Sequence, residues 1–205
     1  MIKIKLALLL CILCVILGCN GKVQSVRFNG TVHTISKDVS LDIAPSFELK
    51  TIVTCEDIKD PNYCLALPIA FYSENYVKVK DKKLVGWINV TWSEIYDQSE
   101  YPKQTGELFY INDNPVYGYF YKHHLLLIDD SSLFQAGLRS LKEHGIQFSS
   151  DMFYDYVMSY NIDSKHRVMW SYLALDGEQF QEMTDEVLKM VLRQSLVSNT
   201  TIKIK

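Results

Sequence analysis

The sequence predicts an α+β domain: a mostly antiparallel sheet from the first half, covered by helices from the second half and ending in a long amphipathic helix. Two patterns carry this prediction. Apolar and polar residues alternate, with turn residues between the runs, as far as residue 128. Beyond Ser132, apolar residues recur at helical spacing. Strands first and helices later, without regular alternation, are typical of the α+β class.

Two hairpins are expected in the strand-rich half. Asn29-Gly30 lies between runs 23–28 and 31–35, and Asn-Gly between alternating runs is the strongest short hairpin signal. The turn residues 112–115 join a second pair of runs in a similar way. The strands of this second hairpin are expected at residues 108–111 and 116–121, and the remaining strands at residues 40–43, 47–53, 65–72, 76–80, 84–92, 124–128 and 167–175.

Three helices are expected in the second half. Ser132 and Gln135 form a capping box at the start of the first helix, and Gly145 ends it. Residues 152–160 are expected to form a short helix, and residues 178–196 the long one. The core-facing stripe of the long helix is expected to be Phe180, Met183, Val187, Val191 and Ser195.

The last forty residues or so carry a pattern of strand, Asp176-Gly177 break and long amphipathic helix. This pattern resembles the end of the Mog1/PsbP/DcrB-like fold. The resemblance rests on the order of elements rather than on a motif.

Residues 1–18 have the layout of a secretory signal. Lys3 and Lys5 precede an apolar run from Leu6 to Leu17, which is shorter than the roughly twenty residues that span a bilayer. Polar residues follow directly after Gly18. The segment is therefore predicted to direct export rather than to remain as a membrane helix.

The end of this segment, Ile16-Leu17-Gly18-Cys19, resembles the lipobox of bacterial lipoproteins. The resemblance implies that Cys19 carries lipid (palmitate-type acyl chains) and that the peptide before it is removed. Two or three acyl chains make a stable anchor, whereas one gives only marginal binding. Leu17 departs from the commoner small residue. The alternative is an ordinary signal cut at Gly18 or Gly21.

The chain is thus divided into a signal peptide (1–18), a lipidated tether (19–22), a single domain (23–197) and a frayed tail (198–205). We expect a membrane-anchored protein that faces the periplasm or the cell surface. Asn20 replaces the aspartate that retains lipoproteins at the inner membrane of enteric-type bacteria, so the outer membrane is favoured where the cell has one. The whole chain has a formal net charge of −3 and no basic run, which argues against nucleic acid as a partner.

The remaining cysteines of the mature chain, Cys55 and Cys64, are predicted to form a structural disulfide in an oxidising compartment. A redox pair and two buried thiols are the alternatives. Three glycosylation sequons would matter only in a eukaryotic or viral protein. They begin at Asn29, Asn89 and Asn199.

No catalytic motif is recognisable, and no cofactor or metal site is predicted. His123-His124 and Asp129-Asp130 form the most suggestive polar cluster. Adjacent residues of a strand point to opposite faces, so only one histidine can join a given site. Helix capping is the preferred role for the two aspartates. An envelope hydrolase that uses His124 or His166 with a carboxylate is kept as an alternative function.

Tyr117, Tyr119 and Tyr121 alternate along one predicted strand, so their rings share a face. Tyrosine is enriched at protein interfaces, which makes this row a candidate protein-binding face. A sheet face lined beneath later helices and a sugar-binding groove are the alternatives. The preferred function is a non-enzymatic, protein-binding lipoprotein, for example an immunity or exclusion protein. A structural or assembly lipoprotein of a surface or secretion machine is the other alternative.

Overall fold

The computed structural model describes residues 32–34, 39–54, 57–58, 69–95, 98–124, 132–148, 152–175, 180 and 182–204. Cys19, Cys55 and Cys64 lie outside these residues, so lipid attachment and the disulfide stay predictions. The Asn29-Gly30 hairpin and the pair Asp129-Asp130 also lie outside them. No helix in the described ranges has both the length and the apolar character needed to span a membrane.

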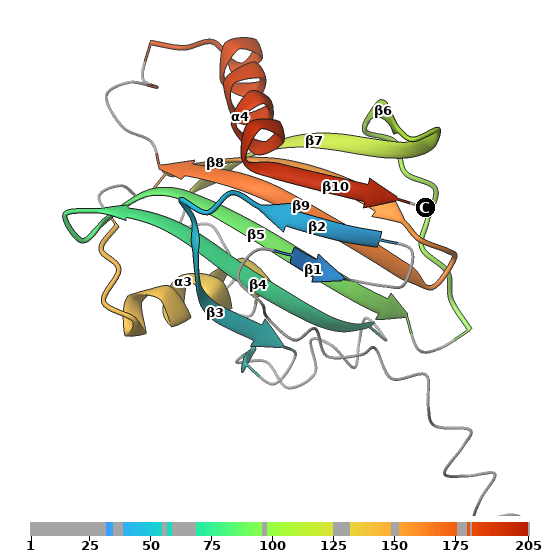
Figure 1. Cartoon of the computed structure of the whole chain (residues 1–205), viewed down its shortest axis with the longest axis horizontal. Helices are drawn as coiled ribbons and strands as arrows, with labels where there is room; N and C mark the ends of the chain where they lie inside the picture. The colour runs from blue at the N-terminus through green and yellow to red at the C-terminus, as the bar shows by residue number, and fades with distance from the viewer. Residues whose placement is uncertain are drawn as a thin grey trace, which may run out of the picture.

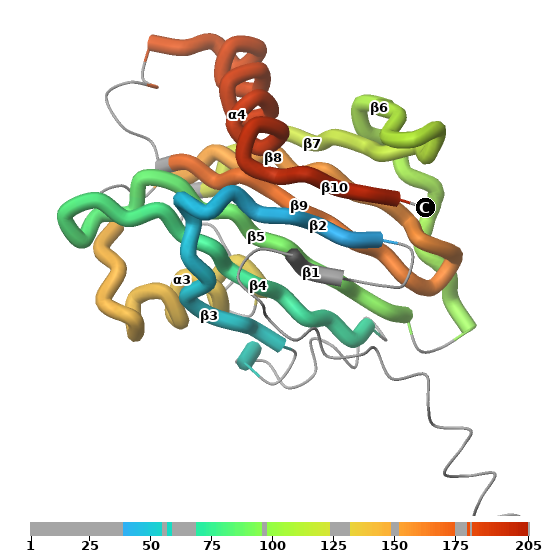
Figure 2. The backbone as a smooth tube through the Cα atoms, viewed as in Figure 1, coloured from blue at the N-terminus to red at the C-terminus, as the bar shows by residue number. Residues whose placement is uncertain are grey.

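Strands dominate the described part of the chain (Figures 1 and 2). The elements in chain order are β1 (Val32–Thr34), β2 (Val39–Ile43), β3 (Glu48–Thr54), β4 (Ile69–Lys80), β5 (Lys83–Ile95), β6 (Glu107–Ile111), β7 (Asn114–His124), α3 (Leu133–Glu143), β8 (Met152–Asn161), β9 (His166–Leu175), α4 (Asp185–Asn199) and β10 (Thr200–Ile204).

A seven-stranded antiparallel sheet forms the centre of the molecule, in the order β3-β4-β5-β9-β8-β7-β6. A second sheet has the order β1-β2-β10, and it joins the last strand of the chain to the second. The predicted α+β class is therefore wrong. The described residues form a mostly antiparallel β structure with two helices, and the second half contributes strands as well as helices.

The predicted helix at 152–160 is strand β8, which lies between β9 and β7. A strand with both faces covered loses the clean alternation of a half-exposed strand. In β8, Phe153 and Tyr154 point to opposite faces and are both buried. The aromatic residues of β8 are also of the kind that favours strands.

The long helix α4 begins at Asp185, after Thr184 as N-cap, and not at residue 178. Its stripe also differs from the prediction, because Val187 is 37% exposed while the buried residues lie one position further on. The tail that was expected to fray continues as β10 and pairs with β2. The buried residues of α4 are Leu188, Leu192 and Leu196.

Several local predictions are confirmed. Ser132 caps α3 by accepting a hydrogen bond from the Gln135 backbone N–H at 3.2 Å. Gly145 follows the helix with φ of +77°, where a residue without Cβ is favoured. The hairpin of β6 and β7 turns at Asn112 and Asp113, both with positive φ. Such φ values match the primed turns that suit twisted hairpins.

The two faces of the large sheet are covered by different elements. Figure 1 shows β10, β2 and β1 lying across one face, and α4 packs against β8 and β9 on that side. This layer encloses the larger apolar core. Helix α3 packs on the opposite face over a smaller cluster. That cluster consists of Val77, Leu84, Trp87, Leu138, Leu141, Ile146, Phe153 and Leu173.

One carboxyl group is buried on the α4 side of the sheet. Glu74 on β4 is 3% exposed, and its Oε2 accepts a hydrogen bond from the Tyr76 hydroxyl at 2.8 Å. Burial raises the pKa of Glu74 from 4.5 to about 7, although hydrogen bonds from Tyr76 and Tyr72 oppose the change. The folded chain therefore binds a proton at Glu74 more tightly than the unfolded chain does.

This raised pKa predicts a pH-dependent stability. The contribution of protonated Glu74 is fully present below pH 4.5 and is lost as the pH rises through about 7. Above that range the ionised group should cost about 3 kcal/mol of unfolding free energy. We expect Glu74→Gln to be more stable than the wild type at pH 8 and similar at pH 4.5, in urea titrations at both values. An unchanged pH dependence in the variant would contradict this assignment.

Candidate functional site

The α3-facing side of the large sheet carries a band of buried polar side chains. Strand register places these side chains on one face, and each is less than 9% exposed. Buried polar groups cost free energy unless they are hydrogen-bonded, so such a band needs internal partners. The band consists of Thr51, Ser73, Asn75, Thr91, Ser93, Asp155, Ser159 and Ser171.

A hydrogen-bond network around Asn75 satisfies much of this band. The Asn75 Oδ1 accepts from Trp87 Nε1 at 2.9 Å and from Asn89 Nδ2 at 2.8 Å. The Asn89 Nδ2 also donates to Ser73 Oγ at 2.7 Å, and Thr91 Oγ1 donates to Asn89 Oδ1 at 2.8 Å. Asn89 heads one of the sequons, and its amide is committed to the sheet. The Asn75 Nδ2 is buried and has no partner among the described residues.

Trp87 links this network to α3. Its ring is 1% exposed and stacks on Phe134 with centroids 5.5 Å apart. Phe153 meets the same indole edge to face at 6.4 Å. A Cβ at Gly137 would lie only 3.1 Å from the indole, so glycine allows α3 to approach this closely. The position of the helix therefore depends on the indole beneath it.

A row of stacked rings leads from the edge of the sheet to this point. Tyr119 stacks on Tyr121 with centroids 6.3 Å apart, and Tyr121 stacks on His123 at 6.0 Å. His123 stacks on Phe134 at 4.8 Å. Tyr117 lies on the same face of β7, because it too is an odd-numbered residue of the strand. We call Tyr119, Tyr121, His123 and Phe134 the aromatic row.

Asp155 on β8 lies beside the aromatic row. Its Oδ2 is 3.5 Å from His123 Nε2, and the strand register places it opposite Tyr121. Burial raises the pKa of the Asp155 carboxyl, against the opposing influence of His123 and Ser171. The Asp155 Oδ1 is buried without a hydrogen-bond partner among the described residues. The carboxyl therefore has an unused acceptor atom.

A cavity of about 210 Å³ opens between the aromatic row and the polar band. Trp87, Phe134 and Leu133 supply apolar wall, while Asn75 and Asp155 supply polar atoms. The cavity thus combines apolar walls with a few polar groups, which is the usual composition of a binding pocket. The other described lining residues are Asn89, Thr91, His123, Val157, Met169, Trp170, Ser171 and Leu173.

The order of groups in this cavity differs from that of a nucleophilic triad. In a triad, the imidazole lies between the hydroxyl and the carboxylate. Here Asp155 is the central group, with Ser171 and His123 on either side. The arrangement is therefore not that of a Ser-His-Asp triad.

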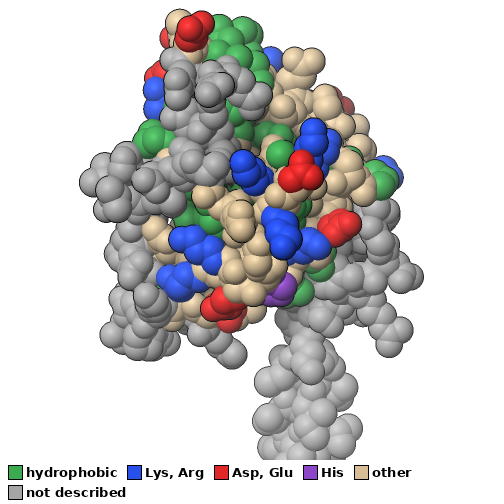
Figure 3. All heavy atoms as spheres, turned by 90° about the vertical axis from the view of Figure 1, so that its left-hand side faces the viewer, with side chains coloured by type: hydrophobic (Ala, Val, Ile, Leu, Met, Phe, Trp, Pro, Cys, Tyr) green, Lys and Arg blue, Asp and Glu red, His purple; other side chains and the backbone are tan. Residues whose placement is uncertain are grey.

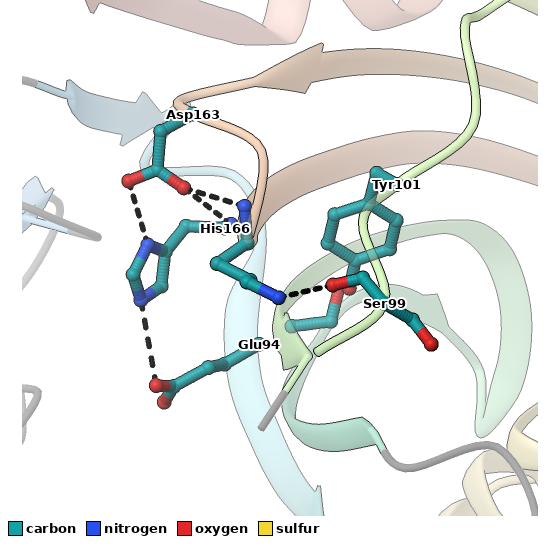
Figure 4. A network of polar contacts seen from close by, with 7 residues as sticks. Glu94, Ser99, Tyr101, Asp163 and His166 are labelled. Atoms are coloured by element: carbon teal, nitrogen blue, oxygen red, sulfur yellow. Dashed lines mark hydrogen bonds and ion pairs between the residues drawn. The ribbon is translucent and has the colours of Figure 1, made fainter. Parts of the chain in front are cut away.

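His166, one of the two histidines considered for a hydrolase, lies elsewhere, at the turn between β8 and β9 (Figure 4). Its Nδ1 is 2.7 Å from Asp163 Oδ2, and its Nε2 is 3.6 Å from Glu94 Oε1. Asp163 Oδ1 also accepts hydrogen bonds from the backbone N–H groups of Lys165 and His166. These hydrogen bonds lower the pKa of Asp163, although partial burial alone would raise it.

Carboxylates face both ring nitrogens of His166, because Asp163 is hydrogen-bonded to Nδ1 and Glu94 lies within ion-pair distance of Nε2. The ring also stacks on Trp92 at 5.7 Å. The cluster therefore closes the β8–β9 turn. No group of three or more His, Cys, Asp and Glu in the described ranges has the arrangement of a metal site. The side chain of His124 lies outside the described residues.

Basic side chains gather near the turn of the β4–β5 hairpin, at the end of the molecule seen in Figure 3. Lys78, Lys80, Lys82 and Lys83 are all exposed there. Asp81 lies among them, and Figure 3 shows further carboxylates at this end. The charges are mixed, and we assign no site to this surface.

The chain significantly matches no protein-family model, no curated protein and no solved structure.

The sequence alone predicts the tyrosine row of this site, but it does not predict Asp155 or the polar band. The tyrosine row lies on one strand face as expected, with His123 on the same face. Asp155 was missed because β8 was predicted to be a helix. The polar band was missed because alternate Ser, Thr and Asn residues in strands such as β5 suggest a solvent-exposed face. The signal available was Asn89, Thr91 and Ser93 at every second position.

The close approach of α3 to Trp87 gives a testable prediction. Gly137→Val should lower the unfolding free energy by about 1–3 kcal/mol, because methyl groups would press on a rigid indole. Glu143→Val places the same residue on the exposed last turn of α3 and should cost less than about 1 kcal/mol. Urea denaturation followed by tryptophan fluorescence measures both. Equal stability of the two variants would show that the contact is not tight.

Proposed function

We propose that this protein is an exported lipoprotein, anchored through Cys19, that binds a protein partner without acting as an enzyme. The observation that carries the binding part is the aromatic row, which runs from an exposed edge of the sheet to a cavity. An immunity or exclusion protein is one concrete form, because such a protein meets its partner at a membrane. The anchor rests on the signal and lipobox pattern of residues 1–19.

Exposed apolar side chains at the β6–β7 edge support a protein partner. Tyr121 is 45% exposed, Leu108 is 46% exposed and Tyr110 is 67% exposed. Leu108 pairs with Tyr117 in register, so its side chain lies on the same face as the tyrosines. Exposed aromatic groups of this kind are typical of interface hot spots. The exposed edge therefore continues the aromatic row outward.

The alternatives are a hydrolase and a structural or assembly lipoprotein. Carboxylates face both ring nitrogens of His166 at a turn between strands, which supports a structural role for this histidine over a catalytic one. A structural or assembly lipoprotein would share the anchor and the exposed edge. It differs in its partner, which would be a component of a surface or secretion machine rather than an incoming protein.

The binding face can be tested by photo-crosslinking in cells. We expect p-benzoylphenylalanine in place of Tyr121 to give a discrete adduct, because that side chain is exposed beside the cavity. The same crosslinker in place of Met190, which is 57% exposed on α4 and so lies on the opposite side of the sheet, should give none. Adducts are detected as shifted bands and identified by mass spectrometry.

A double change of Tyr117 and Tyr119 to Ala serves as the specificity control. It should abolish the adduct formed at position 121, since it removes neighbouring rings of the same face. Equal adducts at positions 121 and 190, or an adduct that survives the double change, would discard this face as the binding surface.

The anchor has a separate test. Wild-type protein should enter the detergent phase in a temperature-induced phase separation, because two or three acyl chains bind a micelle stably. Cys19→Ala should remain in the aqueous phase once its signal is removed. Metabolic labelling with a palmitate analogue gives an independent reading. Aqueous partitioning of both proteins would mean that Cys19 carries no lipid.

A further inference from the structure

We propose that the cavity beside the aromatic row receives a lysine side chain of the protein partner, with its ammonium group on Asp155 Oδ1. This inference deepens the proposed function and rests on it for the source of the lysine. The charge of the cavity, its size and its lining each argue for this occupant.

The charge comes from the cavity's single carboxylate. Among the described lining residues, Asp155 is the only acidic side chain, and none is Lys or Arg. A buried carboxylate is costly unless a cation or hydrogen-bond donors compensate it. The Asp155 Oδ2 faces His123, which leaves Oδ1 unsatisfied. A cationic ligand would supply the missing partner.

The number of carboxyl oxygens without a partner at Asp155 favours an ammonium group over a guanidinium group as the ligand. Arginine binds carboxylates best through two parallel hydrogen bonds, which require both oxygens. At Asp155 only Oδ1 is without a partner among the described residues. Lysine presents a compact charge that can be satisfied at one oxygen.

The size of the cavity favours one side chain over a whole small ligand. Pockets that enclose drug-sized ligands have volumes of roughly 300–1,000 Å³. The cavity of about 210 Å³ is smaller than that range. Leu133, Val157 and Met169 line it and offer apolar contact to the methylene stem of a lysine. The stacked rings of His123 and Phe134 also line the cavity.

A second unsatisfied atom favours a peptide over a simple amine. Asn75 lines the cavity from β4, three strands away from Asp155 on β8, and its Nδ2 has no acceptor among the described residues. A peptide segment carries carbonyl oxygens beside its charged side chain. It can therefore meet both the donor and the carboxylate, which an alkylammonium ion cannot.

Small probes test this inference on the full-length protein in dodecyl maltoside, a detergent without charge. The probes are Nα-acetyl-lysine methylamide, the corresponding arginine, norleucine and glutamate derivatives, and n-butylammonium. The readout is the indole N–H resonance of Trp87 in ¹⁵N-correlated NMR spectra, since this group lines the cavity and donates to Asn75. We expect saturable shifts with the lysine probe and binding at least about 10-fold weaker for each of the others.

Two variants give matched controls. Asp155→Asn keeps the shape of the side chain and removes its charge, and it should weaken lysine-probe binding by at least about 10-fold. Val157→Phe fills the cavity without touching a charge and should abolish binding. Circular dichroism reports whether each variant folds, and the ranking of probes on the wild type needs no variant.

Several results would overturn the inference. Norleucine or glutamate probes that bind as well as the lysine probe would exclude a cation site, and stronger binding of the arginine probe would exclude lysine. Equal binding of n-butylammonium would remove the argument for a peptide. The probe titration requires no partner. A crosslinked adduct at Tyr121 without probe binding therefore overturns the lysine pocket alone, and the reverse result overturns the protein-binding face.

Discussion

The hydrogen bonds that converge on Asn75 set the positions of the other groups on the α3-facing side of the sheet. Its Oδ1 accepts from both Trp87 and Asn89, which fixes the plane of the indole. Phe134 stacks on that indole, and His123 stacks on Phe134. Because protein interiors are close-packed, a shift of the indole is transmitted to its neighbours. The geometry of the cavity therefore depends on the buried side-chain amide of Asn75.

The two faces of the large sheet bury different kinds of side chain. The face under β2, β10 and α4 is mainly apolar, with Glu74 as its buried carboxyl. The α3-facing side buries hydroxyl and amide groups that must satisfy one another. A fully satisfied polar network specifies one arrangement, whereas an unsatisfied member is costly. Three atoms of this face, Asn75 Nδ2, His123 Nε2 and Asp155 Oδ1, have no hydrogen-bond partner among the described residues, and all three residues line the cavity. Such exceptions are few in native proteins, and a bound ligand group is one explanation for them.

Local signals in the sequence were informative, and long-range ones were not. Hairpin turns and the α3 cap depend on neighbouring residues, so the β6–β7 hairpin and Ser132 could be predicted. Strand β8 could not, because its identity depends on being covered from both sides by elements far away in the chain. The start of α4 was missed for a related reason. Phe180 was assigned to the helix stripe, while Thr184 supplies the N-cap. The candidate site follows the same division, since the tyrosine row lies on one strand while Asp155 and Asn75 reach it through sheet topology.

The proposed anchor and the proposed pocket have complementary energetics. A pocket that receives one side chain contributes modest binding energy, and association must first offset the loss of translational and rotational freedom. A lipid on Cys19 would confine the protein to a membrane surface. A partner that meets the same surface then binds at a raised effective concentration, as in tethered two-site systems. Under that constraint, the proposed binding would need only a short aromatic row and a single carboxylate to be selective. Released from the membrane, the same surface would bind its partner only weakly.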